Sequence, residues 1–322
     1  MEHLLTIRIA SVESDLPGIV DVLNVCEPNH PTTVEALRPY FEDRTPGHVD
    51  RRLVAVDEKE TVLGYSVAVH VAEAPAHHFY VWIGVDPAHR FQGNGSALWD
   101  ASLSLLQEQS ATRLSSEVPD SDQAGLTFAQ QRGFSIDRQH FYSVLDLTTF
   151  DETPYLPLIA GLEAEGIRFC SLADLPDSPE TRRKFYELNL AVVRDIPGED
   201  WNFENYPIFF EKHILESPNF RREGQLLAVE GDTLAGLAAV SLFTDKQSAY
   251  NATTGVIRAY RGRKIALALK VLSARYARQS GMQKLRTDND SLNAPILAIN
   301  RRLGYQPQPG TYHLVHWLGE DN

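Results

Sequence analysis

The residues best suited to chemistry lie in a short stretch of arginine and glycine after a predicted strand. Residues 90–95 read Arg-Phe-Gln-Gly-Asn-Gly, follow an apolar run that ends at Val85, and precede a helical pattern that begins at Ser96. Glycines at a helix N-terminus let backbone N–H groups approach a ligand closely, and the helix dipole there favours a phosphate. The stretch therefore predicts an anion-binding loop, to which Arg90 adds a positive charge.

A second copy of this stretch occurs 171 residues later in the chain. Residues 261–266 read Arg-Gly-Arg-Lys-Ile-Ala, follow a predicted strand that ends at Val256, and again precede helical spacing. Each copy is followed at the same distance by a glycine and an aromatic residue, Gly133-Phe134 in one and Gly304-Tyr305 in the other. A spacing shared by two separate motifs indicates an internal duplication.

The duplication extends over most of the chain. Arg8 matches Arg168 and Gly64 matches Gly236, and the growing offset places additional residues of the second copy around 195–201. Prolines and acidic residues at 151–157 interrupt the periodicity, so we expect two domains, residues 1–150 and 151–322. Each half combines hairpin-like strands with strand–helix alternation, which predicts an α/β fold with a mixed sheet.

Composition limits the classes of partner. The 322 residues include 30 basic and 43 acidic side chains, a net charge of −13, which opposes binding to nucleic acid or to an anionic membrane. Cys26 and Cys170 have no ligand-like spacing, so we expect neither a disulfide framework nor a metal site. Without a leader-like N-terminus or a bilayer-length apolar run, the sequence predicts a cytoplasmic protein, and it makes no prediction of oligomeric state.

The pattern Arg-x-x-Gly-x-Gly after a strand resembles the acetyl-CoA signature of the GCN5-related N-acetyltransferases (GNAT). Residues 90–95 fit this signature in full, and the second copy departs from it at Lys264, which stands at the first glycine position. The resemblance includes Asn293, ahead of a helix that ends at Gly304-Tyr305. A dinucleotide-binding loop is disfavoured because its third glycine would fall at Leu98.

The resemblance implies two tandem GNAT-like domains that use acetyl-CoA, with a strand beside the pantetheine arm and the loop around the pyrophosphate. The residues so implied to contact the cofactor are Val85, Arg90, Phe91, Gln92, Gly93, Asn94, Gly95 and Ser96, and in the second copy Val256, Arg261, Gly262, Arg263, Lys264, Ile265, Ala266, Leu267 and Asn293. A primary amine of a small molecule or peptide would then attack the thioester directly in a ternary complex.

The catalytic candidates depart from the family's pattern. Many members carry a tyrosine five residues before the final aromatic residue to protonate the leaving thiolate, but Ala129 and Asn300 stand at these positions. Asn300 can still donate a hydrogen bond near the sulfur, although it is no acid. Asp288, at the end of a strand that the family opens toward substrate, is a candidate base or amine anchor, and Glu117 is its equivalent in the first copy. A solvated turn is the alternative for both carboxylates.

Two further points remain open in the sequence. Asp290 shares the candidate role of Asp288, and Asp195, Glu199 and Asp200 either line a pocket for a basic substrate or are surface charges. We expect an N-acetyltransferase whose second copy is catalytic. The alternative, from another class, is a non-catalytic CoA-binding or sensing protein with one or both halves degenerate, which the missing tyrosine favours.

Overall fold

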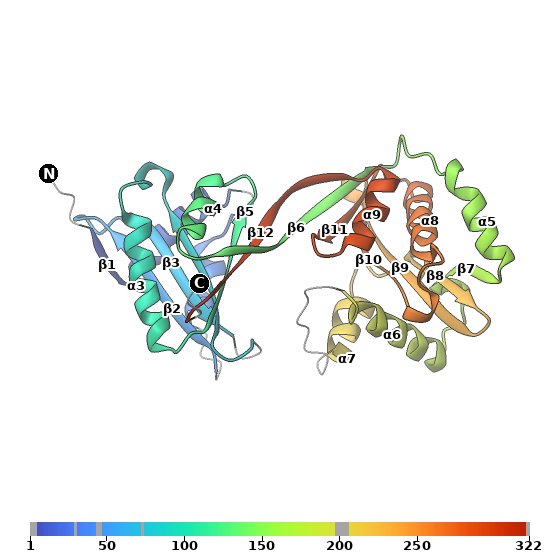
Figure 1. Ribbon diagram of the computed structural model, residues 1–322, viewed down its shortest axis with the longest axis horizontal. Coiled ribbons are helices and arrows are strands. Elements are labelled where there is room, and N and C mark those ends of the chain that lie inside the picture. Colours follow the sequence, from blue (N-terminus) through green and yellow to red (C-terminus); the bar gives the residue numbers. More distant parts are fainter. Residues whose placement is uncertain (1–4, 29–30, 43–46, 72–73, 197–205, 320–322) are drawn as a thin grey trace. The chain divides into compact units, whose positions relative to one another are not determined.

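The computed structural model describes residues 5–28, 31–42, 47–71, 74–196 and 206–319, which form two compact units (Figure 1). The first unit comprises residues 1–137 and 312–322, and the second comprises residues 138–311. Each contains six neighbouring strands of a mixed sheet with helices on its faces, so the predicted α/β fold class is confirmed. No helix within these ranges is both long enough and apolar enough to cross a membrane.

The first unit has the sheet order β1-β2-β3-β4-β5-β12. Its elements are β1 (Thr6–Ile9), α1 (Leu16–Cys26), α2 (Val34–Glu42), β2 (Val49–Val56), β3 (Val62–His70), β4 (His78–Val85), α3 (Asn94–Glu108), β5 (Arg113–Pro119), α4 (Gln123–Gln130), the start of β6 (Ser135–Asp146) and the end of β12 (Gln306–Trp317). Side chains alternate across β2: Val54 packs with Leu16 of α1, whereas Ala55 packs with Leu98 of α3. The two helices therefore cover opposite faces of the sheet.

The second unit has the sheet order β6-β11-β10-β9-β8-β7. It adds α5 (Leu156–Ala164), β7 (Ile167–Ser171), α6 (Pro179–Val193), α7 (Tyr206–Phe209), β8 (Gln225–Glu230), β9 (Thr233–Phe243), β10 (Ser248–Val256), α8 (Ile265–Gln279), β11 (Lys284–Asp290) and α9 (Ala294–Leu303). Leu227 of β8 packs with Phe185 of α6, and the next residue, Ala228, packs with Leu269 of α8. Helices α6 and α8 thus cover opposite faces, as Figure 1 also shows.

Each sheet opens between its two parallel strands. Strand β4 pairs with β5 from His78 opposite Arg113 to Tyr80 opposite Ser115, and then continues to Val85 beyond that pairing. Strand β10 pairs with β11 over the equivalent stretch, which ends with Tyr250 opposite Arg286. Beyond these points β4 remains paired with β3 and β10 with β9, but pairing with β5 and β11 has ended.

The last strand of each sequence copy belongs to the other copy's unit. Leu147, after β6, donates its N–H to Gln283 O (2.8 Å) in the second unit, and Leu318, after β12, donates its N–H to Thr112 O (2.8 Å) in the first. Each donor and each acceptor has its counterpart 171 residues away, so the two bonds are equivalent. The division into 1–150 and 151–322 stays a prediction about the sequence copies, because the compact units exchange the segments 138–150 and 312–322.

We predict that Leu314→Ala destabilises the first unit although Leu314 lies near the end of the chain. Leu314 is fully buried in the cluster that contains Leu114 of β5, so the truncation should cost about 2–5 kcal/mol of unfolding free energy. Hydrogen exchange should accelerate in β5. Ser143→Ala, at the equivalent position of the second unit, is the control, and acceleration confined to β11 in the Leu314 variant would contradict the strand exchange.

Candidate active site

The first loop is fixed at both ends by side chains. A 3₁₀ turn, Pro87–His89, follows β4, and the Asp86 carboxylate accepts a hydrogen bond from Ala88 N (2.9 Å). The buried Asn94 at the start of α3 donates from Nδ2 to His89 O (2.8 Å). The predicted strand–loop–helix succession is present, and the turn is tied to the helix that follows it.

The second loop repeats this backbone with different residues. A 3₁₀ turn, Arg258–Tyr260, again separates the strand from the helix. Two positions have positive φ in each copy: Phe91 (61°) and Gly93 (91°) in the first, Gly262 (81°) and Lys264 (64°) in the second. A left-handed non-glycine residue costs about 1–2 kcal/mol. Each loop thus has one glycine and one strained residue, and Lys264 keeps the conformation of the glycine that it replaces.

The start of each helix fits an anion. Neither helix has a side-chain cap, and its first turn closes with Ala97 N–H on Gly93 O (3.0 Å) or Ala268 N–H on Lys264 O (3.2 Å). The preceding amides, at 94–96 and 265–267, point out of the helix end, where they lack an intrahelical acceptor. A Cβ built on Gly93 or Gly262 meets nothing within 4 Å. The loops therefore leave these N–H groups open to an anion such as phosphate.

The two motif arginines hold the loops in place. Arg90 Nε donates to Val85 O (2.9 Å), and Arg261 Nε donates to Val256 O (3.1 Å), which is the last residue of the strand in each case. Arg261 and Arg258 also pair with Asp195, and hydrogen bonds from Arg258 in particular lower the pKa of that carboxyl group. Phosphate contact by these arginines remains a prediction, to which the structure adds a positioning role.

Asp195 is therefore a partner of the loop arginines, although a substrate contact by it remains a prediction. The other two acidic residues of that segment, Glu199 and Asp200, lie outside the described residues.

A cation that sequence reasoning missed lies beside the first helix start. Arg132 Nη2 donates to Ser96 Oγ (2.8 Å), and its guanidinium lies 3.4 Å above the centre of the Phe128 ring. Leu303 occupies the equivalent position in the second copy, where Lys264 instead adds an exposed ammonium to the loop. Each helix start thus has a nearby cation, supplied by a different residue. The only sequence signal was the position of Arg132 directly before Gly133.

Each candidate carboxylate lies just past the point where the strands part, beside a tyrosine. Tyr250 donates its hydroxyl proton to Asp288 Oδ2 (2.8 Å). Burial, followed by the charge of Asp288, raises the pKa of Tyr250, so the phenol stays protonated and remains a donor. In the first unit burial and then Glu117 raise the pKa of Tyr80, and Glu117 pairs with His313 (3.2 Å).

The two tyrosines were missed because a bulge shifts the repeat by one residue. The pairing of β10 with β9 slips between Asn251 and Thr253, whereas β3 and β4 pair without a shift beside Tyr80. Asn251 Nδ2 donates to Ala239 O (3.0 Å), and Thr287 Oγ1 donates to Asn251 O (3.0 Å). These side chains stabilise the bulge where β10 leaves β11.

Asn300 belongs to a buried polar chain in the second unit. Its Nδ2 donates to Asn289 Oδ1 (2.7 Å), and Asn289 Nδ2 donates to Ser143 Oγ (2.9 Å). The equivalent residues of the first unit, Ala129, Val118 and Leu314, are apolar and share one hydrophobic cluster. Asn300 Oδ1 is buried without a partner among the described residues. A hydrogen bond from Asn300 near the cofactor sulfur remains a prediction.

A buried lysine extends this difference between the units. Lys270 on α8 is 1% exposed, and its Nζ lies 4.7 Å from the centre of the Tyr305 ring. Burial lowers the pKa of Lys270 to about 7. The equivalent pair in the first unit is Trp99 and Phe134, whose rings meet edge to face at 5.7 Å. The second unit thus has polar groups at five positions where the first unit has apolar ones, namely 143, 270, 289, 300 and 305.

Two other candidates act locally in the structure. Asn293 caps α9 by accepting a hydrogen bond from Ile296 N (3.4 Å), which leaves its predicted cofactor contact untested. Asp290 accepts hydrogen bonds from His140 Nε2 (2.8 Å) and Leu292 N (2.7 Å). Asp290 therefore fixes the turn after β11, whereas Asp288 accepts its hydrogen bond from Tyr250 of β10.

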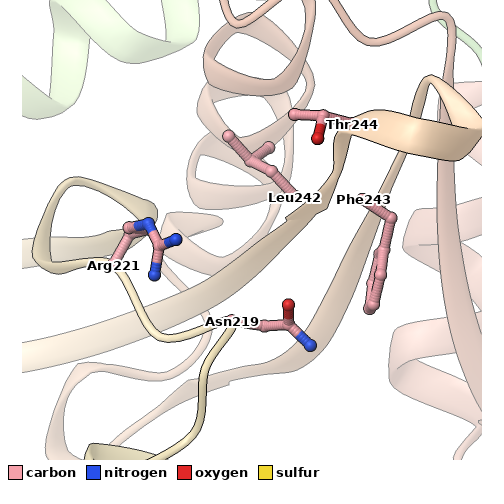
Figure 2. Close-up of a pocket in the computed structure, with 5 residues that line it drawn as sticks. All are labelled: Asn219, Arg221, Leu242, Phe243 and Thr244. Atoms are coloured by element: carbon pink, nitrogen blue, oxygen red, sulfur yellow. The ribbon is translucent and has the colours of Figure 1, made fainter.

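A cavity of about 250 Å³ lies at the end of β9 (Figure 2). Its lining residues are Asn219, Arg221, Leu242, Phe243 and Thr244. Figure 2 shows Asn219 and Arg221 on a loop that faces the end of this strand. Phe243 lies opposite Ser248 of β10, two residues before Tyr250. Within the described ranges, no group of three or more His, Cys, Asp or Glu residues is arranged to hold a metal ion.

The acetyltransferase (GNAT) family profile matches residues 17–134 and 181–305, more than half of the chain. No curated protein sequence matches this chain. A GCN5-related N-acetyltransferase from Sphaerobacter thermophilus is similar in structure, with a TM-score of 0.64 at 18% identity over 97% of this chain and 95% of that one.

Two further solved structures are similar over almost the whole chain. A tandem GNAT protein from the clavulanic acid biosynthesis pathway has a TM-score of 0.58 at 19% identity, covering 99% of this chain and 100% of that one. A glucosamine N-acetyltransferase region of a fungal multi-domain protein has a TM-score of 0.65 at 18% identity; the match covers 98% of this chain and 38% of that one. At these identities the likeness shows the fold.

We predict that Lys270 makes the stability of the protein depend on pH. Its pKa is 10.5 when unfolded and about 7 when folded, so between these values the unfolded chain binds more protons. The unfolding free energy should therefore rise as pH increases from about 7 toward 10.5. Denaturant unfolding at several pH values measures this slope.

Lys270→Met should flatten the slope and raise stability at pH 7 by about 1–3 kcal/mol, because it removes a buried amine that has no hydrogen-bond acceptor among the residues described. Lys284→Met, at an exposed position of β11, is the control. An unchanged slope in the Lys270 variant would refute the assignment.

Proposed function

The chain belongs to the acetyltransferase (GNAT) family, and on this premise we propose that it transfers an acetyl group from acetyl-CoA to a primary amine of a small molecule or peptide. Membership supports N-acetyltransferase activity in general, and the resemblance and tandem fold class predicted from the sequence are confirmed. The observation that carries the proposal is the carboxylate of Asp288, held by Tyr250 where β10 and β11 part.

The cofactor side of the proposal rests on the two helix starts. The amides at 94–96 and 265–267, with Arg132 or Lys264 nearby, would hold the phosphates of the cofactor. The unpaired edges of β4 and β10 offer N–H and C=O groups to the pantetheine amides, as an added strand would. When bound, acetyl-CoA supplies the acetyl group as a thioester that an amine attacks directly.

On the acceptor side, Asp288 anchors the ammonium group and accepts the proton that the amine releases. Tyr250 fixes the carboxylate by donating a hydrogen bond to Oδ2, which leaves Oδ1 for the acceptor. Asp288 is 59% exposed, so an acceptor can reach it. The net charge of −13 favours a cationic or neutral acceptor over an anionic one.

We propose further that chemistry takes place in the second unit and that the first unit binds CoA without turnover. In the first unit Glu117 is paired with His313, and the polar chain of Asn300 is replaced by apolar residues. The first loop nevertheless keeps the open helix start and the nearby Arg132. This division of roles joins the catalytic and the binding interpretations of the sequence.

We predict that Asp288→Asn lowers kcat/KM about 10²- to 10⁴-fold, the usual contribution of a general base. Release of the CoA thiol from acetyl-CoA, measured with a panel of polyamines, aminoglycosides, amino acids and peptides, reports the loss. Glu117→Gln is the matched control in the first unit and should keep activity. A larger loss in the Glu117 variant would reverse the assignment, and acetyl-CoA binding without turnover on any amine would leave only the binding function.

We predict that Gly93→Glu and Arg261→Glu each remove one of two CoA-binding sites. The glutamate at 93 adds a negative charge where a phosphate would bind, and the change at 261 removes the hydrogen bond to Val256 O. Calorimetric titration with CoA should fall from two equivalents to one in each variant and to none in the double variant. Two equivalents persisting after either change would refute the site concerned.

A further inference from the structure

Arg286 is a second charged group on the face that carries Asp288. It lies on β11 opposite Tyr250 of β10, and the side chains of residues 286 and 288 share one face of the strand because they are two positions apart. The residues between and beside them, Leu285 and Thr287, are buried on the other face, whereas Arg286 is 53% exposed. The exposed face of β11 therefore carries the guanidinium of Arg286 and, two residues further on, the carboxylate of Asp288.

The guanidinium packs against two tyrosine rings and makes only a long ion pair with Asp288. Its Cζ lies 4.5 Å from the centre of the Tyr142 ring and 6.0 Å from that of Tyr250. The distance from Nη2 to Asp288 Oδ1 is 3.9 Å, longer than a hydrogen bond. An aromatic face orients the guanidinium plane and leaves its edge, which carries the N–H donors, to bind a carboxylate.

The first unit lacks this feature at the equivalent positions. Ser115 stands where the second unit has Arg286, and His313 stands where it has Tyr142, although the tyrosine and the carboxylate are present in both units. The cation was therefore gained or lost separately from the carboxylate. Arg286 is confined to the unit that has the polar chain of Asn300, whereas both units have the helix starts that would bind the cofactor. The guanidinium therefore points to the acceptor rather than to the cofactor.

A pair of opposite charges two residues apart on a strand, about 7 Å between Cα atoms, complements a ligand with opposite charges a few ångströms apart. We propose that the acceptor is a zwitterionic amine, a free α-amino acid, whose ammonium group meets Asp288 and whose carboxylate binds Arg286. The proposal rests on the proposed function of the second unit and names its substrate class. Such an acceptor is neutral as a whole, so the net charge of −13 does not repel it.

The test compares acceptors that differ only at the carboxylate, namely glycine, alanine and phenylalanine against their α-carboxamides. The full chain is assayed for CoA release as wild type, as Arg286→Ser, which installs the residue of the first unit, and as Arg301→Ser, an exposed charge-matched control on α9. The ratio of variant to wild type is compared for each acceptor, because an amino acid and its amide differ in amine basicity.

Arg286→Ser should lower kcat/KM about 10- to 100-fold for the amino acids and less than about twofold for the amides, because only the acids lose a charge-assisted hydrogen bond. Arg301→Ser should affect neither series, and Asp288→Asn should affect both. Equal losses for acids and amides in Arg286→Ser would overturn the proposal.

A binding measurement separates this proposal from the proposed function. Calorimetry with the same acceptors, in the presence of CoA, should detect amino-acid binding to the wild type that weakens in Arg286→Ser. If no amine is acetylated, the proposed function fails, and such selective binding would still support recognition of the zwitterion. Absence of amino-acid binding to the wild type would overturn it.

Discussion

The candidate site of each unit depends on the loss of backbone pairing between two parallel strands. Pairing of β10 with β11 stops at Tyr250 and Arg286, and pairing of β4 with β5 stops at the equivalent residues. Backbone N–H and C=O groups that leave a sheet require new partners. Thr287 supplies one by donating its hydroxyl proton to Asn251 O, and Asn251 supplies another by donating from Nδ2 to Thr253 O. An extended amide-containing ligand is the natural partner for such an edge.

The duplication shows which features of the loop determine its backbone. Glycine and non-glycine residues exchange places at the two positions of positive φ, yet both loops keep the 3₁₀ turn and the uncapped helix start. What the copies share instead is the arginine that donates to the last carbonyl of the strand. The loop conformation therefore depends on this hydrogen bond more than on either glycine. This explains why Lys264, a departure from the sequence signature, leaves the backbone geometry intact.

The local features could be predicted from the sequence, and those that depend on pairing between distant segments could not. The loops at Arg90 and Arg261 follow from short motifs read in order. The strand exchange was not predictable, because a repeat of 171 residues looks the same whichever copy each final strand joins. Tyr250 escaped notice because the bulge at Ala252 moves it one residue out of that repeat. Lys270 was missed because helical periodicity does not distinguish a buried lysine from a surface one.

The buried polar residues of the second unit lower its folding stability, which indicates that they serve a function. Lys270 and the Tyr305 hydroxyl are buried with no hydrogen-bond partner in the part of the chain that the structure describes, and such groups destabilise a core that the first unit fills with Trp99 and Phe134. If selection for stability alone had acted on two copies that began alike, both would have kept apolar residues at these core positions. Arg286 occurs in the same unit as the polar set, and it lies on β11 on the face opposite to Asn289, which belongs to that set. Their joint presence there supports the proposal that the acceptor binds in the second unit rather than in the first.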